Sequence, residues 1–451
     1  MGKKLIVIGG GAGGYSAAVK AAHLGAEVIL AEAANIGGTC LNIGCVPTKS
    51  LLYTAGFYRS ALNNAVPGVK ITGVELDWAA AQSAKETAVK RLTNGVNVLL
   101  RSRGVTIINE KATPLSGQSV RIGAEIHKAD AVILAVGSVN SPLTFQGAGL
   151  PCVIDSTIAL SLEHVPESMV IVGGGVIGVE LAALYSSLGT KITIIELTSS
   201  LLPQMDADIS EYIQAALEAN GVCVHTNARL IHAKQTHDNN TISFFKDGKT
   251  LSTSASTVLV AAGRRPNTDS LNLEDIGVKM TCGAIDTDEY FMTNIPGLYA
   301  VGDCNGKTML AHAAMAQGET AAEHIMNVKT SINNRIIPAC VYTSPEIACV
   351  GLTENQAIAS GTEVSVGLFD LRGNSRAVIE GSGGFVKIIA DKKLGEVLGV
   401  HIAGPYATEL IAEAALCMSI EGTVEDIVNT VHAHPTVGEY MRETAMTLFR
   451  E

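Results

Sequence analysis

The sequence lacks several features that would place it in common classes of protein. Its apolar runs all fall well short of the about 20 residues that a membrane-spanning helix needs. No strongly basic run occurs, and 43 acidic residues outnumber 32 basic ones for a formal net charge of −11, which argues against nucleic acid or an anionic membrane as a partner. Nine cysteines, an odd number and mostly far apart, do not make the framework of a secreted disulfide-rich protein. The apolar stretch after Lys4 ends in glycines after four residues, too short for a signal peptide, so we expect a cytoplasmic protein.

The chain is instead rich in apolar residues and glycine. Its 451 residues suggest roughly two to four domains. Hydrophobic residues make up 47% and charged residues 17%, so the chain has ample material for a core and disorder is not expected. The 46 glycines against 13 prolines indicate tight turns and close backbone approaches.

A diverged repeat accounts for part of this glycine content. Residues 5–32 and 169–196 align without a gap at an offset of 164, with eight identities in 28 positions. Each copy contains an apolar strand, a Gly-x-Gly-x-x-Gly turn, an Ala-rich helix and a second strand that ends in an acidic residue. This pattern is typical of βαβ units that bind dinucleotides. We therefore expect an α/β fold with two Rossmann-like dinucleotide-binding domains.

Three glycines in each copy have separate roles. The first allows the tight turn, the second lets the backbone approach a pyrophosphate, and the third lets the helix pack on the sheet. In that order they are Gly9, Gly11 and Gly14 in the first copy, and Gly173, Gly175 and Gly178 in the second. The terminal acids Glu32 and Glu196 can accept hydrogen bonds from ribose hydroxyls, and a carboxylate at Glu196 favours NAD over NADP because it would repel a 2′-phosphate. The alternative is a glycine turn that binds no ligand. Two complete copies of the motif, each with a terminal acid, argue against this alternative.

A pair of cysteines, Cys40 and Cys45, follows the first repeat. In a regular helix two residues five positions apart lie too far apart for a disulfide, but Gly44 and Pro47 would let the backbone deform there. Buried structural thiols and a metal site are alternatives, although zinc sites usually have a second ligand pair nearby and none follows. Next to a dinucleotide-binding fold, a redox-active dithiol is favoured over both.

These motifs together resemble those of a known family. The stretch GGTCLNIGCVPTK at residues 37–49, the two glycine motifs, AVGS, GRRPNT, YAVGD, MLAH, YTSPEIACVGLTE and HAHPTVGE are similar to those of the flavoprotein pyridine nucleotide–disulfide oxidoreductases, over nearly all of the chain. The resemblance implies non-covalent FAD, one per chain, in the first βαβ unit and NAD in the second. It also implies a C-terminal α+β domain that forms a homodimer.

The resemblance assigns the domains and the active-site cysteines. We expect an FAD-binding domain in two parts, at residues 1–145 and 265–336. An NAD-binding domain at residues 146–264 lies between these parts, and a dimerisation domain follows at residues 337–451. By resemblance, Cys40 exchanges with the substrate sulfur and Cys45 lies against the flavin. Lys49 lies near flavin N5, paired with Glu180.

Other positions carry over as cofactor contacts. For FAD these are Glu32, Gly38, Thr39, Ala112, Val136, Gly137, Ser138, Asp303, Met309, Leu310, Ala311 and His312. For NAD they are, besides the glycines, Glu180, Glu196, Leu230 and Gly263. The family often has threonine where Val136 stands. No metal is expected.

Two histidines lie near the C-terminus, in the stretch HAHPTVGE that begins at residue 432. A histidine can take a proton from a thiol near neutral pH, and a neighbouring carboxylate raises its basicity and fixes its tautomer. By resemblance, His434 and Glu439 form that pair. Thr436 and Glu439 also have the spacing of a capping box, and both roles can coexist at one helix start. We expect His432 to be an ordinary structural histidine.

Within the family, the motifs are closest to those of the members that oxidise protein-bound dihydrolipoamide with NAD⁺. Glutathione-type reductases are the alternative activity. They usually carry basic residues that hold NADP at this point, whereas the sequence after Glu196 reads LTSS and has none. Mercuric reductases and high-molecular-weight thioredoxin reductases carry an extra C-terminal cysteine or selenocysteine pair, whereas Cys417 is the last cysteine here, so we expect neither activity. The expected partner is a lipoyl-carrying protein of a 2-oxo acid dehydrogenase or glycine cleavage system. A non-catalytic flavin- or nucleotide-binding protein is the contrasting class and would not need Cys40, Cys45 and His434 together.

Overall fold

The computed structural model describes residues 2–63, 66–235, 240–330 and 332–449. The chain forms two compact units that alternate along the sequence. The first unit consists of residues 1–50, 82–142 and 263–334, and the second of residues 51–81, 143–262 and 335–451. Two helices, α3 (Cys45–Leu62) and α4 (Trp78–Ser102), run from one unit into the other. The predicted boundaries of the FAD-binding, NAD-binding and dimerisation domains stay a prediction.

The first unit is built on a five-stranded sheet in which every strand pair is parallel. Its strands, in spatial order, are β20 (Leu298–Ala300), β7 (Ala131–Leu134), β1 (Lys4–Ile8), β2 (Glu27–Ala31) and β3 (Thr106–Ile108). β1, β2 and β7 are almost wholly apolar and buried, as expected for a parallel sheet covered on both faces.

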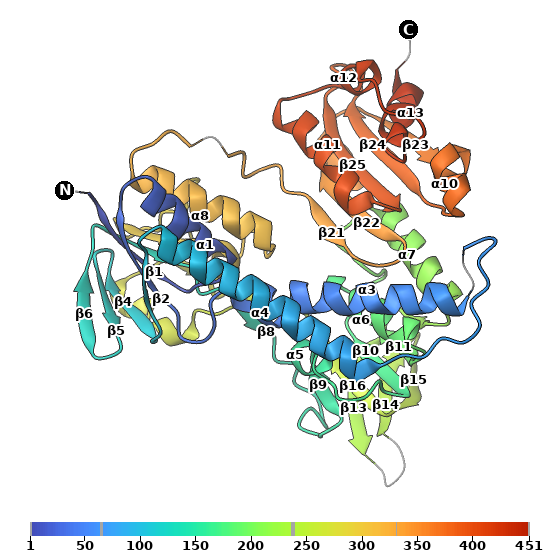
Figure 1. Cartoon of the computed structure of the whole chain (residues 1–451), viewed down its shortest axis with the longest axis horizontal. Coiled ribbons are helices and arrows are strands. Elements are labelled where there is room, and N and C mark those ends of the chain that lie inside the picture. The colour runs from blue at the N-terminus through green and yellow to red at the C-terminus, as the bar shows by residue number, and fades with distance from the viewer. Residues whose placement is uncertain (1, 64–65, 236–239, 331, 450–451) are drawn as a thin grey trace. The chain divides into compact units, whose positions relative to one another are not determined.

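Two helices, α1 (Ala12–His23) and α8 (Ala311–Ile325), lie side by side in this unit (Figure 1). They approach closely because their contact residues are small: a Cβ added at Gly318 would lie 2.3 Å from the carbonyl oxygen of Gly13. The short helix α2 (Gly38–Ile43) leads into α3. Smaller elements complete the unit: β4 (Ala112–Ser116), β5 (Ser119–Ile122), β6 (Glu125–Lys128), β8 (Ser138–Asn140), β17 (Arg264–Pro266), β18 (Met280–Thr281), β19 (Ala284–Ile285), η1 (Asp269–Leu271), η2 (Glu274–Ile276) and η3 (Gly302–Asn305).

The second unit contains another five-stranded parallel sheet. In spatial order its strands are β12 (Cys223–His225), β11 (Lys191–Ile195), β10 (Ser168–Val172), β16 (Thr257–Val260) and β9 (Val153–Asp155). Its helices are α5 (Ser156–Ala159), α6 (Val176–Ser187) and α7 (Ala207–Ala219). An antiparallel sheet accompanies it, formed by β13 (Arg229–Gln235), β14 (Asn240–Lys246) and β15 (Lys249–Ala255).

The predicted repeat is confirmed by these elements. The strand–helix–strand unit β1–α1–β2 has its counterpart in β10–α6–β11, and each bound is displaced by the same number of residues. In both sheets the first strand of the repeat lies between the second strand and a later one, β7 or β16. The two halves therefore share topology as well as sequence, and both have the Rossmann-like arrangement expected from the glycine motifs.

The C-terminal part of the second unit is an antiparallel sheet covered by helices. In spatial order its strands are β21 (Ala339–Val341), β22 (Glu346–Gly351), β25 (Val397–Gly404), β24 (Phe385–Asp391) and β23 (Val364–Asp370). Its helices are α9 (Glu354–Ala359), η4 (Leu371–Gly373), α10 (Ser375–Glu380), α11 (Ala407–Ser419), α12 (Val424–Asn429) and α13 (Glu439–Leu448). Apolar residues of β22, β24 and β25 form one core with α11, α12 and α13. This confirms the mixed α/β class with an α+β C-terminal domain.

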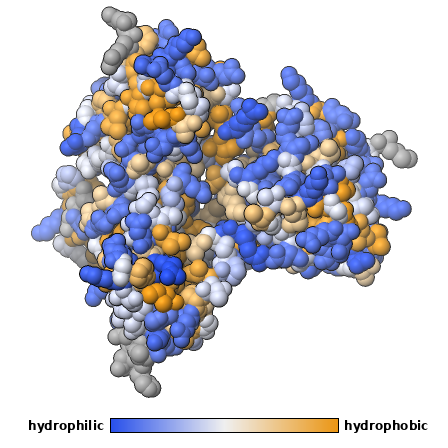
Figure 2. All heavy atoms as spheres, turned by 180° about the vertical axis from the view of Figure 1, so that it is seen from behind, coloured by the Kyte–Doolittle hydropathy of each residue, from blue (hydrophilic) through white to orange (hydrophobic). Residues whose placement is uncertain are grey.

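Apolar side chains also reach the surface among hydrophilic ones (Figure 2). In the C-terminal part, Leu416 is 65% exposed, Ile420 is 69% exposed and Val431 is 94% exposed. Leu416 and Ile420 are four residues apart at the end of α11, so they share one face of that helix. These side chains are available for an interface.

Candidate active site

The first glycine turn has the geometry of a phosphate-binding loop. Gly9 has a φ of +103°, and a Cβ there would lie 2.3 Å from the carbonyl oxygen of Ala135. A Cβ at Gly14 would lie 1.8 Å from the carbonyl oxygen of Gly9, so this turn requires glycine at both positions. Gly11 is the N-cap of α1 and makes no side-chain cap, which leaves the first N–H groups of the helix available to an anion.

The second glycine turn repeats these features. Gly173 has a φ of +114°, and a Cβ at Gly178 would lie 2.0 Å from its carbonyl oxygen. Gly175 is the N-cap of α6, and a Cβ there would meet no atom within 4 Å. The open space in front of a helix N-terminus fits a pyrophosphate.

The two acidic residues that end the repeats have equivalent hydrogen bonds. Glu32 accepts from the backbone N–H of Gly10 at 2.6 Å, and Glu196 accepts from the backbone N–H of Gly174 at 2.5 Å. Glu196 also accepts from the N–H and hydroxyl of Thr198, at 2.7 and 2.8 Å. The carboxylates thus hold the glycine turns in place, a role that the sequence analysis did not assign. Each carboxylate has about four lone-pair sites, which leaves capacity for ribose hydroxyls.

The two cysteines are brought together by a break between two helices. Helix α2 carries Cys40 and ends at Ile43, and α3 begins with Cys45. A Cβ at Gly44 would lie 2.9 Å from the carbonyl oxygen of Thr39, so glycine permits the tight connection. Both cysteines are reduced thiols that are partly exposed to solvent. A side-chain hydrogen bond joins Cys40 to Cys45, and this contact, followed by burial, raises the pKa of Cys40 above its ordinary value.

Two further side chains lie beside this cysteine pair. The positive charge of Lys49, one turn after Cys45 on α3, opposes part of this rise in the pKa of Cys40. Tyr15, on α1, has a raised pKa, first because of burial and then because of the charges of Cys40 and Cys45. Tyr15 is not among the site residues predicted from the sequence. Its position directly after Gly14 was the available signal, since that places it in the first turns of the nucleotide-binding helix.

A polar network joins two of the three segments that form the first unit. Ser138 donates a hydrogen bond from its hydroxyl to Asp303. Arg264 donates to the hydroxyl of Ser138 at 2.8 Å, to its carbonyl oxygen at 2.7 Å and to Asn140 at 2.8 Å. Arg264 was missed as a site residue although it lies in the GRRPNT motif. It acts on Asp303 through Ser138, and this contact between distant segments has no sequence signature.

The remaining predicted FAD positions lie on several loops of the first unit. Gly38 has a φ of +58°, and a Cβ there would lie 2.7 Å from Cα of Gly11, so the two loops approach closely. Thr39 follows it in the first turn of α2. The others are placed as follows: Ala112 is buried at the start of β4, Val136 and Gly137 follow β7, and Met309, Leu310, Ala311 and His312 form the N-terminus of α8, where Leu310 is the N-cap.

The predicted NAD positions divide between the units. Glu180, on α6, is buried and accepts a hydrogen bond at 3.0 Å from the backbone N–H of Tyr342, in the C-terminal part of the same unit. Leu230 lies on β13, half-buried. Gly263 and Lys49 belong to the first unit. The pairing of Lys49 with Glu180 therefore stays a prediction.

His434 and Glu439 form a hydrogen-bonded pair in the second unit. The distance between His434 Nδ1 and Glu439 Oε1 is 2.9 Å. The backbone N–H of Thr436, first, and His434, second, lower the pKa of Glu439, so its carboxylate stays charged over the range in which a histidine titrates. His434 keeps 69% of its side chain exposed, which leaves its Nε2 accessible.

The capping box predicted at Thr436 is only half formed. Glu439 accepts from the N–H of Thr436 at 2.9 Å, but Gly438 is the N-cap of α13 and the Thr436 hydroxyl donates to the carbonyl oxygen of Ala433. Helix α13 begins at Glu439, too late for Thr436 to cap it. His432 contacts Glu413 at 2.8 Å and the carbonyl oxygen of Thr430 at 3.0 Å, as a structural histidine would.

The described residues offer neither a metal site nor a membrane-spanning helix. No group of three or more His, Cys, Asp or Glu side chains in these ranges could hold a metal ion. None of the helices within them is long and apolar enough to cross a bilayer.

Comparisons with known proteins agree with this geometry. Residues 3–318 match the family described as pyridine nucleotide-disulphide oxidoreductase, and residues 337–445 match its dimerisation domain. The chain is 41% identical to a dihydrolipoyl dehydrogenase of Bacillus subtilis, over 98% of each chain. It is 37% identical to the mitochondrial dihydrolipoyl dehydrogenase of Pisum sativum, over 99% of this chain and 91% of the relative. The crystal structure of LpdA from Mycobacterium tuberculosis superposes with a TM-score of 0.91 at 28% identity, covering 99% of this chain and 100% of that one.

The two cofactors of this family, FAD and NAD(H), suit the residues present. Each glycine turn leaves a helix N-terminus open and is hydrogen-bonded by a carboxylate that directly follows the second strand of the repeat. Together the two family matches span nearly the whole chain. The resemblance expected from the sequence motifs is thereby confirmed: the chain belongs to the pyridine nucleotide–disulphide oxidoreductase family, as an FAD- and NAD-dependent oxidoreductase with a dimerisation domain.

Proposed function

We propose that this protein is a dihydrolipoyl dehydrogenase, which oxidises protein-bound dihydrolipoamide to lipoamide and reduces NAD⁺ to NADH. The observation that carries the proposal is the contact between Cys40 and Cys45 at the break between α2 and α3. Relatives that bear this name are 37–41% identical to the chain over nearly its full length.

The sulfur chemistry follows from the contact between the two thiols. In the oxidised protein, Cys40 and Cys45 form a disulfide. A dihydrolipoamide thiolate attacks Sγ of Cys40, a mixed disulfide forms, and Cys45 leaves as a thiolate. The second thiol of the substrate then attacks the substrate sulfur that is bonded to Cys40. The disulfide of lipoamide closes, and Cys40 is released. Two electrons have then moved from the substrate to the cysteine pair.

His434 is the proposed base of this exchange. It takes the proton of the attacking thiol, and Glu439, already bonded to Nδ1, stabilises the imidazolium and fixes Nε2 as the reactive nitrogen. We propose that His434 of the partner subunit serves Cys40 and Cys45, so that each active site of a homodimer contains residues from two chains. The exposed apolar side chains of the C-terminal part support such an interface.

The chain's own residues supply binding and orientation for the cofactors. Gly9, Gly11, Gly14 and Glu32, with Asp303 at η3, would hold FAD, and the corresponding turn around Gly175 with Glu196 would hold NAD. FAD bound there would supply a two-electron acceptor for the dithiol and a hydride donor for NAD⁺. Lys49 and Tyr15 lie beside the cysteines, and the positive charge of Lys49 favours the thiolate form of Cys40.

The direct test of the function compares two activities of the purified protein. One assay follows NAD⁺ reduction with dihydrolipoamide, and the other follows NADPH oxidation with glutathione disulfide. We expect the first activity to exceed the second by orders of magnitude. The reverse ranking would replace the proposal with a glutathione-type reductase, and protein that is colourless or not reduced by NADH would support a non-catalytic binding protein.

The partners follow from the same proposal. A lipoyl group attached to another chain, in a 2-oxo acid dehydrogenase or glycine cleavage system, would deliver dihydrolipoamide. We place this reaction in the cytoplasm, in keeping with the bacterial relative that is 41% identical.

The nucleotide preference gives a first quantitative prediction. Glu196 is buried next to the glycine turn, and two like charges a few ångströms apart at a dielectric of about 20 repel by a few kcal/mol. We expect the kcat/KM for NADH to exceed that for NADPH by about a hundredfold or more. Leu197→Arg, at a side chain that is 67% exposed, should reduce this ratio by roughly tenfold through a favourable charge near the 2′-phosphate.

The matched control for this prediction is Leu197→Gln, which changes size and polarity without adding charge. Steady-state kinetics with both nucleotides measure the ratio for each variant. Equal specificity constants for NADH and NADPH in the wild-type protein would refute the role of Glu196.

A further inference from the structure

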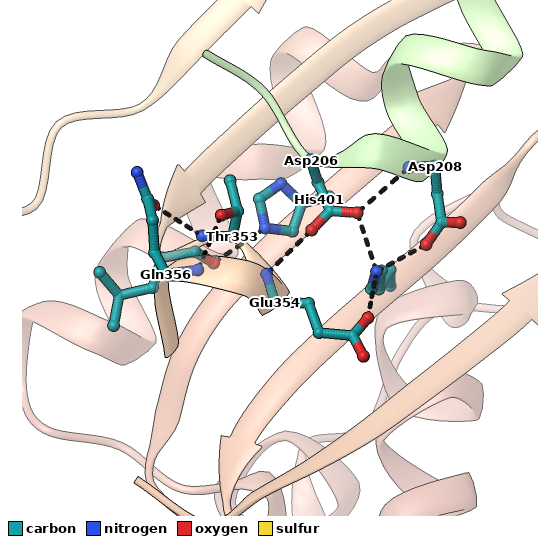
Figure 3. Close-up of polar contacts among 8 residues, drawn as sticks. Asp206, Asp208, Thr353, Glu354, Gln356 and His401 are labelled. Carbon is teal, nitrogen blue, oxygen red and sulfur yellow. Dashed lines mark hydrogen bonds and ion pairs between the residues drawn. The ribbon is translucent and has the colours of Figure 1, made fainter. Parts of the chain in front are cut away.

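A buried lysine in the C-terminal sheet holds three carboxylates. The ammonium of Lys387, on β24, lies 2.8 Å from Asp206, 2.6 Å from Asp208 and 2.7 Å from Glu354 (Figure 3). The side chain of Lys387 is 3% exposed and that of Asp206 is 2% exposed. Three donors thus meet three acceptors, and the ammonium is fully satisfied.

The members of this cluster come from segments far apart in the sequence but within one unit. Asp206 is the N-cap of α7, in the nucleotide-binding part, and accepts from the backbone N–H of Asp208. Its second oxygen accepts from the backbone N–H of Glu354, at the start of α9, at 2.9 Å. The cluster therefore fixes the N-terminus of α7 to the C-terminal antiparallel sheet.

The charges of the cluster are fixed by these contacts. Burial alone would lower the pKa of Lys387, but its hydrogen bonds to the three carboxylates outweigh burial and raise it. Burial alone would raise the pKa of Asp206, and the contacts with Lys387 and Glu354 outweigh it and lower the pKa. His401, opposite Lys387 on β25, is buried and has a lowered pKa because of that burial, so it is neutral near pH 7. Lys387 supplies the positive charge, and its removal would leave the buried carboxylate of Asp206 uncompensated.

The segment at residues 196–206 connects this cluster to the second glycine turn. It begins with Glu196, which accepts from the N–H of Gly174, and it ends with Asp206. Between them, the backbone N–H of Leu202 donates to the carbonyl oxygen of Gly174 at 2.9 Å. Leu202 has a φ of +48° and is buried. Both backbone groups of Gly174 are therefore held by this one segment, whose far end is anchored by Lys387.

We propose that Lys387 is a positioning residue for NAD(H) recognition. Through Asp206 it fixes the end of the 196–206 segment, and through that segment it holds Glu196 and the glycine turn in register for the pyrophosphate and ribose. The C-terminal domain thereby contributes to nucleotide binding without touching the nucleotide. The inference rests on the proposed assignment of the NAD site to Gly173, Gly175, Gly178 and Glu196.

The test compares Lys387→Met with Lys392→Met. Lys392 lies just beyond the same strand and forms an ion pair with Glu363 at 3.8 Å, with 59% and 84% of the two side chains exposed, so its loss removes a charge without opening a buried cluster. The first readout is the dissociation constant of ADP-ribose, measured by isothermal titration of the FAD-loaded dimer. The second readout compares two quantities in each variant: the KM for NADH and the rate at which dihydrolipoamide reduces the protein.

We expect Lys387→Met to weaken ADP-ribose binding and raise the KM for NADH by about tenfold, with the dihydrolipoamide half-reaction within twofold of wild type. Lys392→Met should match wild type in all three. An ADP-ribose affinity within twofold of wild type in Lys387→Met would overturn the inference. A parallel loss of FAD and of both half-reactions would overturn it too, because it would show general support of the fold. Wild-type protein that binds neither ADP-ribose nor NADH would instead refute the proposed function.

A second variant keeps the test decisive if Lys387→Met does not fold. Asp206→Asn retains a good N-cap for α7 but removes the charge that faces Lys387. We expect it to weaken ADP-ribose binding in the same direction, with normal reduction by dihydrolipoamide. Unchanged ADP-ribose affinity in this variant would also overturn the inference.

Discussion

Replacement of Cys45 by serine is expected to lower dihydrolipoamide oxidation at least about a thousandfold, and replacement of Cys40 to do the same. Each variant removes one sulfur of a pair that acts as a unit, so neither can form the disulfide that the substrate attacks. The contact between the two thiols at the helix break carries this expectation. Steady-state rates with dihydrolipoamide and NAD⁺ measure the loss.

The two variants serve as controls for each other, because their spectra should differ. Cys40→Ser leaves a thiolate at residue 45, next to the flavin in the proposed assignment, and should show a long-wavelength thiolate-to-flavin band without any reduction. Cys45→Ser should show no such band even after partial reduction. If the spectra of the two variants are exchanged, the assignment of the exchanging and flavin-side cysteines is reversed.

Replacement of His434 by glutamine is expected to lower the same activity by about a hundred- to ten-thousandfold, the contribution typical of a general base. Glutamine can keep a hydrogen bond to Glu439 but cannot take the proton of a thiol. His432→Gln is the matched control, since His432 is tied to Glu413 and to a backbone carbonyl and has no proposed role in the reaction. Wild-type activity in His434→Gln would remove the proposed base.

Hybrid dimers test whether two chains share each active site. A Cys45→Ser chain and a His434→Gln chain, co-expressed, are each nearly inactive alone. With shared sites, one site of a hybrid dimer collects both defects and the other collects neither, so random pairing should restore roughly a quarter of wild-type activity. No recovery, with hybrid formation confirmed by differential tags, would contradict the shared site.

Local features of the site could be predicted because their causes are local. Each strand, helix and glycine turn of the repeat follows from periodicity and from positions where a Cβ would clash, as at Gly14 and Gly178. Two cysteines at this spacing could not form a disulfide within a regular helix. In the structure the helix is broken at Gly44, one of the two residues expected to let the backbone deform. Pro47 lies within the first turn of α3, a position that tolerates proline.

The parts that could not be predicted depend on contacts between distant segments. Lys387 and Asp206 are 181 positions apart, and no local pattern indicates that a lysine on a strand will be buried against the N-cap of a remote helix. The same holds for Arg264 and Ser138, which are 126 positions apart. The capping box at Thr436 failed for the opposite reason: the local spacing was right, but α13 begins at Glu439, whose carboxylate binds His434 as well.

The central claim is that dihydrolipoamide reduces the Cys40–Cys45 pair, and one labelling experiment tests it directly. The oxidised protein is treated without oxygen with one equivalent of dihydrolipoamide per chain, alkylated with iodoacetamide and mapped by mass spectrometry, with an untreated sample alongside. We predict that Cys40 and Cys45 resist alkylation before treatment, that Cys40 becomes labelled after it, and that the other seven cysteines are unchanged. Labelling of Cys40 to the same extent in both samples, or a change confined to other cysteines, would contradict the account.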